Sequence, residues 1–331
     1  MKPRIMMISM KSNLRTMRYI GLLLMFIFCL TAQNMMAQRG KLFNSDNQLS
    51  SNFATQVFQD SNGFIWIATR NGLNIYDGYN FTTIRKTKED HRGLSSNYIN
   101  CITQDIQGHI LLGTNNSLLL YNGKSFANIP LLDSKNQPFS TYVTQVYRLK
   151  NNDIAVVTSG YGIMLKKENA EVCYAMKGEV ENLKFIHKIL EDKQDRLWII
   201  LENGKLYCAD KKGKVTKQIP GAETLEAKDI RQDNKGNIYL ATKNDGIYLL
   251  KAGSTIFTKI AGIGNLPIDN IYISRDQRLF IGCDGMGIFV YNPVTGFLQN
   301  NPLFSREVNL AKCKITSIIE DFTGNIWVSM L

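Results

Sequence analysis

The sequence predicts an all-β fold: a β-propeller of about seven four-stranded blades, with the last blade incomplete. Three observations lead to this prediction. A motif of about ten residues returns seven times in the 331-residue chain. The copies lie 40 to 48 residues apart, which is the period of propeller blades that each hold several short strands. The stretches between the copies lack the apolar rhythm of about 3.6 residues that helical repeats of similar length require.

The first copy, from Asp60 to Thr69, shows how the motif produces a turn and then a strand. Asp and Asn bond their own backbone in turns, and glycine adopts positive φ without steric cost. The residues after Gly63 are apolar on both alternating faces, which suits a strand that is covered on both sides. We therefore expect four strands in the first blade, from the axis outward: Ala54–Gln59, Phe64–Thr69, Leu73–Tyr76 and Phe81–Arg85.

The seven copies share one position, which Gly63 occupies in the first. The aligned residues are Gly63, Gly108, Asn152, Asp195, Gly236, Asp276 and Gly324, and the steps between them are 45, 44, 43, 41, 40 and 48 residues. The third copy departs most from the motif because it lacks the Asp, the Gly and the Trp. Residues 38–331 are long enough for one propeller domain and contain no low-complexity linker.

Residues 1–37 have the pattern of a secretory signal peptide. They contain five basic residues, no acidic residue and an 11-residue apolar run from Ile20 to Leu30, which is too short for a typical transmembrane helix. We expect export to the periplasm with cleavage after Ala37, and a retained signal anchor is the alternative. Without this segment the formal net charge falls from +11 to +6. Since no run of Lys and Arg remains, we expect this region to bind no nucleic acid.

The seventh copy ends soon after its second strand, at Leu331. Its third and fourth strands are missing, and we expect Arg39–Asn44 to add one strand to this blade. One strand would still be absent, so either the ring closes imperfectly or the chain is the beginning of a longer protein, and we favour the second. Unpaired strand edges promote association, so we expect the isolated chain to be marginally stable or prone to aggregation.

No catalytic or metal-binding pattern emerges from the reactive residues. Five cysteines follow residue 37 without a C-x-x-C motif, which favours buried unpaired thiols over disulfides or zinc: Cys101, Cys173, Cys208, Cys283 and Cys313. The histidines at 91, 109 and 187 share no metal-ligand spacing. The repeated Asp slightly resembles a calcium loop, but an Asp that ties a turn is the preferred interpretation. We expect no metal, no cofactor and no enzymatic activity.

Ligand chemistry is expected where the copies differ. Trp66, Trp198 and Trp327 hold the same place in their copies, which favours a role in the core over a sugar-stacking platform. The loop after each second strand and the loop between blades open on the same face. Polar side chains on these loops can hydrogen-bond sugar hydroxyls, although Asn-Gly and Asp-Gly also simply form good hairpin turns. The candidate ligand-binding residues are Arg70, Asn71, Asn115, Asn116, Tyr161, Lys243, Asn244 and Asp284.

The segment Val57–Gly78 resembles the two-component regulator propeller repeat, as do Ile230–Leu249 and Ile318–Val328. The introduction Leu49–Asn52 and its echo Leu94–Asn97 are also typical of that family. The resemblance implies the periplasmic sensor part of a hybrid two-component histidine kinase from a polysaccharide-degrading Gram-negative bacterium. In that family two seven-bladed propellers precede a β-sandwich, a membrane helix and a kinase, and signalling works through a dimer.

This resemblance implies that the chain is a ligand-sensing propeller without the kinase and output domains. Its expected partners are an oligosaccharide ligand and a second propeller or dimer partner of the parent sensor. No ligand residues can be transferred from the family, because the shared motif is scaffold. Two alternatives stay open: a secreted propeller enzyme that acts on polysaccharide, with carboxylates from several blades, and a propeller scaffold for protein–protein interaction.

Overall fold

The computed structural model describes residues 40–87, 93–210, 212–300 and 313–331. The chain divides into two compact units, of which the second comprises Leu42–Pro302 and Arg306–Leu331. All strands of the described residues belong to this second unit, and one short 3-10 helix, Glu179–Asn182, accompanies them. Of the first unit only Gly40 and Lys41 are described. The predicted signal peptide, residues 1–37, and His91 lie outside the described residues.

Six sheets contain four or more strands, and in the five four-stranded sheets the strands follow one another in chain order. The first two sheets are β1 Ala54–Gln59, β2 Ile65–Thr69, β3 Gly72–Tyr76 and β4 Phe81–Ile84, then β5 Ile99–Gln104, β6 Ile110–Thr114, β7 Leu118–Tyr121 and β8 Phe126–Ile129. The third is β11 Val143–Arg148, β12 Ile154–Thr158, β13 Gly162–Lys166 and β14 Cys173–Ala175, with β9 Leu131–Leu132 and β10 Pro138–Phe139 added at the edge of β14. The fourth is β15 Ile186–Glu191, β16 Leu197–Leu201, β17 Leu206–Ala209 and β18 Val215–Thr216. The fifth is β19 Ala227–Gln232, β20 Ile238–Thr242, β21 Ile247–Leu250 and β22 Thr258–Lys259, and the sixth is β23 Ile268–Ile273, β24 Leu279–Cys283, β25 Gly287–Tyr291 and β26 Leu298–Asn300.

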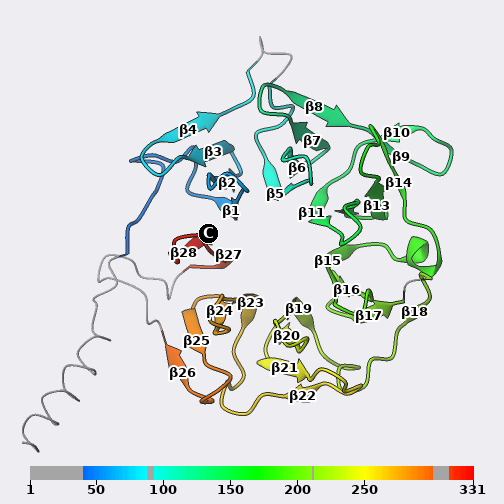
Figure 1. Cartoon of the computed structure of the whole chain (residues 1–331), viewed down its shortest axis with the longest axis vertical. Helices are drawn as coiled ribbons and strands as arrows, with labels where there is room; N and C mark the ends of the chain where they lie inside the picture. The colour runs from blue at the N-terminus through cyan, green and yellow to red at the C-terminus, as the bar shows by residue number, and fades with distance from the viewer. Residues whose placement is uncertain (1–39, 88–92, 211, 301–312) are drawn as a thin grey trace, which may run out of the picture. The chain divides into compact units, whose positions relative to one another are not determined.

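The sheets are arranged around a central axis as in a β-propeller, with the first strand of each sheet innermost (Figure 1). Each innermost strand contacts the innermost strand of the next sheet, in the order β1, β5, β11, β15, β19 and β23. Two further strands, β27 Ile315–Glu320 and β28 Ile326–Met330, form a two-stranded sheet, and β27 contacts both β23 and β1. The predicted all-β propeller arrangement is confirmed with six complete blades.

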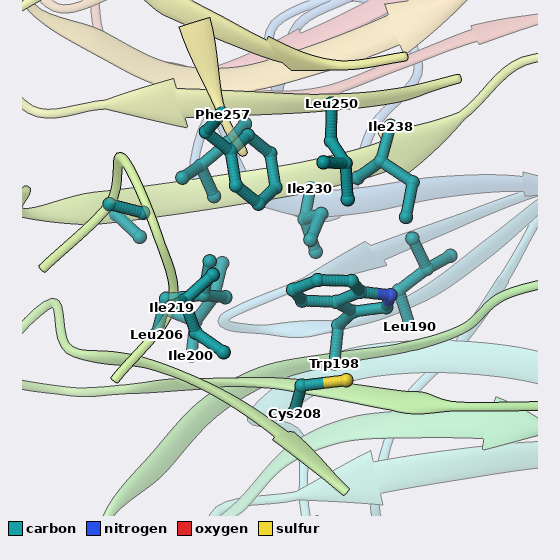
Figure 2. Close-up of a cluster of buried hydrophobic side chains, with 13 residues drawn as sticks. Leu190, Trp198, Ile200, Leu206, Cys208, Ile219, Ile230, Ile238, Leu250 and Phe257 are labelled. Carbon is teal, nitrogen blue, oxygen red and sulfur yellow. The ribbon is translucent and has the colours of Figure 1, made fainter. Parts of the chain in front are cut away.

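Apolar side chains of neighbouring sheets form the core. The second strand is buried at every position in β2, β6, β12, β20 and β24, as a strand covered on both faces should be. Between the fourth and fifth sheets, Trp198 packs edge-on against Phe257 with ring centroids 5.7 Å apart, in one cluster with Ile230 and Ile238 (Figure 2). Trp66 and Trp198 are only 4% and 3% exposed, so the predicted core role of these two residues is confirmed.

The repeated Asp ties the turn between the first two strands, as predicted. One carboxylate oxygen of Asp192 accepts hydrogen bonds from the backbone N–H groups of Gln194 and Arg196, both at 2.9 Å. The other accepts from Nε1 of Trp198 at 2.8 Å. Asp60 and Asp321 bond their tryptophans, Trp66 and Trp327, at the same distance. The motif is therefore a self-contained hydrogen-bonded turn anchored to the core.

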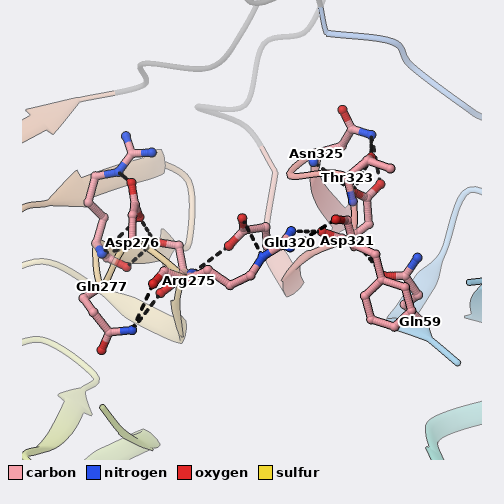
Figure 3. Close-up of polar contacts among 11 residues, drawn as sticks. Gln59, Arg275, Asp276, Gln277, Glu320, Asp321, Thr323 and Asn325 are labelled. Carbon is pink, nitrogen blue, oxygen red and sulfur yellow. Dashed lines mark hydrogen bonds and ion pairs between the residues drawn. The ribbon is translucent and has the colours of Figure 1, made fainter. Parts of the chain in front are cut away.

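Side chains also join neighbouring sheets, and the two-stranded sheet follows the same pattern. Glu320 accepts from the backbone N–H of Arg275 at 2.8 Å, and Gln59 accepts from the backbone N–H of Phe322 at 2.7 Å (Figure 3). Equivalent bonds run from Ser61 to Gln104 and from Lys193 to Gln232. The contact from β27–β28 to the first sheet thus uses the same hydrogen bond as the contacts between complete blades.

Two sequence predictions were wrong in detail. In the sixth copy the shared turn position is held by Gln277, with φ 65°, and not by Asp276, because Ser274 replaces the motif Asp and moves the alignment by one residue. Residues 40–44 form no strand beside β28, and Arg39 is outside the described residues. Instead, Phe43 stacks on Trp327 at 5.8 Å and covers that side of the sheet with an aromatic ring.

Four of the cysteines are buried thiols, as predicted, and the fifth, Cys313, is half-buried. Burial raises the pKa of Cys101, Cys173 and Cys283 to about 12 and that of Cys208 to about 11. Because the thiolate is the reactive form, these four thiols are protected from oxidation and alkylation in the folded chain.

Candidate ligand-binding face

The hairpins after the second strands lie on one face of the ring, and a repeated hydrogen bond fixes them there. The first residue of each hairpin donates its backbone N–H to the carbonyl of the residue just before the first strand of the same sheet. The donor and acceptor pairs, 2.8 to 3.3 Å apart, are Arg70 and Phe53, Asn115 and Tyr98, Ser159 and Tyr142, Glu202 and Phe185, Lys243 and Glu226, and Asp284 and Pro267. We call the surface formed by these twelve residues and their hairpins the hairpin face.

All eight predicted ligand residues lie on this face and are exposed. Several already have partners. The Arg70 guanidinium lies 5.5 Å from the ring centres of both Phe53 and Tyr98. Lys243 forms an ion pair with Glu226 at 3.2 Å, and Tyr161 stacks on Phe139 with ring centroids 4.3 Å apart.

The other predicted ligand residues are four asparagines and one aspartate, namely Asn71, Asn115, Asn116, Asn244 and Asp284. The Asn115 side-chain oxygen accepts from Ser96 at 2.8 Å, and that of Asn116 accepts from Thr114 at 3.0 Å. The carbonyl of Asn71 accepts from Arg85 at 3.2 Å. Asn244 and Asp284 project from the hairpins β20–β21 and β24–β25. These groups share one face, but the eight residues come from five different sheets around the ring.

Sequence reasoning missed an aromatic series on the same face. Phe53, Tyr98, Tyr142 and Phe185 each precede the first strand of sheets one to four, and the side chains of Phe53, Tyr142 and Phe185 are 51%, 41% and 58% exposed. Exposed aromatic rings beside polar loops are typical of surfaces that bind amphipathic ligands. An aromatic residue directly before the innermost strand in four consecutive copies was the signal that could have revealed this series.

A cavity of about 380 Å³ opens beside Phe185, lined by Lys184, Phe185, Leu201, Glu202 and Asn203. Phe185 has φ 51°, a conformation that is strained for a bulky side chain and that often marks functional sites. Neighbouring bonds hold the cavity wall: Ser159 donates to the Glu202 carboxylate at 3.0 Å, and the Lys184 ammonium donates to the Glu181 carbonyl at 2.9 Å.

The second residue of each innermost strand marks a β-bulge. The register of every first strand shifts between its first and third residues, and bulges redirect side chains beside functional sites. In four sheets this residue is neutral and bonds the first carbonyl of the next sheet. The four hydrogen bonds are 2.7 to 3.2 Å long: the Thr55 side chain donates to the carbonyl of Ile99, Asn100 to that of Val143, Thr144 to that of Ile186, and Thr316 to that of Ala54.

Sheets four, five and six carry His187, Lys228 and Asp269 at the bulge instead. Desolvation by the surrounding strands and the nearby Lys188 ammonium lower the pKa of His187 to about 4, although the residue as a whole is exposed, so the imidazole is neutral at neutral pH. Desolvation raises the pKa of Asp269, although its ion pair with Lys314 at 3.4 Å opposes this. Three adjacent sheets thus place ionisable groups where the other sheets have neutral ones, although His187 still bonds the backbone of Lys228 in the next sheet.

A buried ion cluster lies next to these bulge residues. The carboxylate of Asp229 is fully buried and lies 2.6 Å from Lys188 and 3.5 Å from Arg231. Desolvation lowers the pKa of Lys188 to about 8 in spite of this partner. Desolvation opposes ionisation of Asp229, but the two cations outweigh it and lower the pKa of this carboxyl. The Lys188–Asp229 ion pair therefore links the two innermost strands β15 and β19.

Within the described residues, no group of three or more His, Cys, Asp and Glu side chains is arranged to hold a metal ion. Nδ1 of His109 lies 3.0 Å from the carboxylate of Asp105, within the same turn. None of the helices in the described part of the chain has the length and hydrophobicity to span a membrane.

Two of the sequence repeats match a known protein family. Residues 48–71 and 93–116 match the family model described as two component regulator propeller. These two segments are two-component regulator propeller repeats. A curated protein that carries a similar segment, Histidine kinase P4 of Formosa agariphila, is 35% identical over 78 residues, which are 22% of this chain and 6% of that protein.

Solved structures share the fold of the repeat-bearing chain. The extracellular domain assigned to a hybrid two component system of B. thetaiotaomicron aligns with a TM-score of 0.73 at 23% identity, over 88% of this chain and 40% of that one. Virginiamycin B lyase of Staphylococcus aureus aligns with a TM-score of 0.64 at 16% identity, over 88% of this chain and 95% of the lyase. At these identities the likeness shows the propeller fold alone.

Proposed function

We propose that the chain is the ligand-sensing propeller of a periplasmic two-component receptor and that its ligand is a glycan fragment. The observation that carries the proposal is the hairpin face, where exposed aromatic rings, amides and charged groups from several blades share one face of the ring. Such a surface stacks on sugar rings and hydrogen-bonds their hydroxyls. The two-component regulator propeller repeats support the signalling role.

In this proposal β27–β28 is the inner half of a seventh blade. Support comes from the interblade hydrogen bonds, since Gln59 holds Phe322 as Gln104 holds Ser61. Residues 1–37 would direct export, and the kinase and output domains would belong to the parent receptor. A second propeller or a second receptor subunit would be the protein partner, through which ligand binding changes the dimer.

A propeller enzyme acting on polysaccharide is the second candidate. It is favoured by the likeness to virginiamycin B lyase, which extends over nearly the whole of both chains. The ionisable groups His187, Lys228 and Asp269 near the axis would be the residues to test in that case. A third possibility, a scaffold that binds only protein, would leave the hairpin face without glycan affinity.

A glycan array probed with the full chain tests the proposal, followed by calorimetry on the best oligosaccharide. We expect saturable binding without turnover, measured as the absence of new reducing ends or unsaturated products after prolonged incubation. Phe185→Ala should weaken binding, because it removes an exposed ring beside the cavity. The matched control, Phe322→Ala, removes a ring that is 62% exposed in the β27–β28 turn, remote from the hairpins. Turnover of the bound glycan would favour the enzyme instead.

A further inference from the structure

The bulge positions of sheets four to six depart from the pattern that the other sheets follow. Thr55, Asn100, Thr144 and Thr316 use this position to bond the next sheet. The sequence places His187, Lys228 and Asp269 at the equivalent positions. Where one repeat carries a different residue from the others at a structural position, a functional role is expected, because the fold itself does not require that different residue.

Three buried side-chain oxygens in the described residues have no hydrogen-bond partner, and all three belong to innermost strands. They are Oδ1 of Asn100, Oδ2 of Asp269 and Oδ1 of Asn270. Buried acceptors are normally paired, so each such atom calls for an explanation. Two of them, on Asn100 and Asp269, sit at the bulge positions. Hydroxyl groups of a ligand are the donors that such acceptors can use.

The charged side chains around the bulges of sheets four to six include more cations than anions. Lys188, Lys228, Arg231 and Lys314 are opposed by Asp229, Asp269 and Asp284, and His187 is neutral, so one positive charge is in excess. Lys188 and Arg231 both form ion pairs with Asp229. Within the described residues, the Lys228 ammonium has neither an ion pair nor a hydrogen bond, although it lies close enough to His187 and Asp269 to influence both.

We propose that the bulge residues His187, Lys228 and Asp269 form the subsite for an acidic group of the ligand, so that the glycan is a saccharide that carries a carboxylate or sulfate. Lys228 pairs with the acid, and the unpartnered oxygen of Asp269 accepts from a neighbouring hydroxyl. Phe185 precedes His187 by two residues in the chain and contributes the ring surface. This inference rests on the proposed function, and it deepens that function by naming the substrate class.

The test compares Lys228→Gln with Lys251→Gln on an array of neutral, uronate-containing and sulfated oligosaccharides, followed by calorimetry. Lys251 is exposed after β21, at the opposite end of the same sheet, so its replacement removes the same charge away from the subsite. We expect wild-type binding only to acidic glycans, weakened about tenfold or more by Lys228→Gln and unchanged by Lys251→Gln. Circular dichroism and the melting temperature of each variant show whether it is folded.

The outcomes separate the two proposals. Binding of neutral glycans that Lys228→Gln leaves unchanged would overturn the acidic subsite and leave the glycan-sensing function standing. Absence of binding to every glycan by the folded wild-type chain would overturn both. If acidic glycans bind, the class that binds distinguishes a carboxylate from a sulfate, and affinity should fall as salt is raised, because the charge on Lys228 is then screened.

Discussion

The buried Asp192–Trp198 hydrogen bond gives the clearest stability prediction, through the variant Asp192→Ala. Asp192 is fully buried, and Trp198 is 3% exposed. The substitution leaves the indole N–H of Trp198 buried without an acceptor, which costs about 1–3 kcal/mol. It also removes the charged acceptor of the Gln194 and Arg196 backbone N–H groups, worth about 1 kcal/mol more. We expect Asp192→Ala to lower the free energy of unfolding by about 3 kcal/mol.

Asp210→Ala is the matched control. Asp210 accepts from the backbone N–H groups of Lys212 and Lys214 at 2.9 and 3.0 Å, but it is exposed and bonds no tryptophan. Surface replacements of this kind change stability by less than about 1 kcal/mol. Urea unfolding of the full chain, followed by tryptophan fluorescence and circular dichroism, measures both variants. Equal destabilisation by the two replacements would refute the reasoning that the tryptophan bond anchors the blade motif.

Three further predictions concern the hairpin face, the axis and the core. Phe185→Asn should raise stability by about 1 kcal/mol in chemical unfolding, because Asn tolerates φ 51° better than Phe, whereas Phe53→Asn should not; equal effects would count against strain at residue 185. The pKa of His187 is about 4 in the folded chain and near 6.5 in the unfolded chain, so the free energy of unfolding should fall as pH drops from 6.5 to 4. His187→Gln should reduce this dependence of stability on pH. An unchanged dependence would contradict the lowered pKa. Cys101 and Cys283, with pKa values of about 12, should resist alkylation at pH 8 until the chain unfolds, as followed by mass spectrometry; rapid labelling of the native chain would disprove their burial.

Much of the fold follows from local sequence. The turn from Asp60 to Gly63 and the doubly apolar strand after it specify a blade strand by short-range chemistry alone, and the predicted Ala54–Gln59 strand matches β1 residue for residue. The failures occurred where local signals were absent. Ser274 substitutes for Asp at the sixth turn, and residues 40–44 pack through Phe43 on Trp327 without backbone pairing, which only the assembled ring can specify.

For the candidate site, the sequence predicted where the hairpin residues lie but not which other side chains share that face. The hairpin residues were expected on one face because every copy has the same strand order, and they do lie there. The bulge residues His187, Lys228 and Asp269 were missed because a bulge arises from pairing between strands and leaves no local signature. The partnerless oxygens of Asn100 and Asp269 depend on neighbouring sheets, so no reading of one segment could reveal them.

The most direct test of the account is a crystal structure of the full chain with the oligosaccharide that binds best on the array. The account predicts density for the sugar on the hairpin face, with a ring against Phe185 or Tyr142 and an acidic group within hydrogen-bond distance of Lys228. Sugar bound at the opposite face of the ring, or between outer strands, would contradict it.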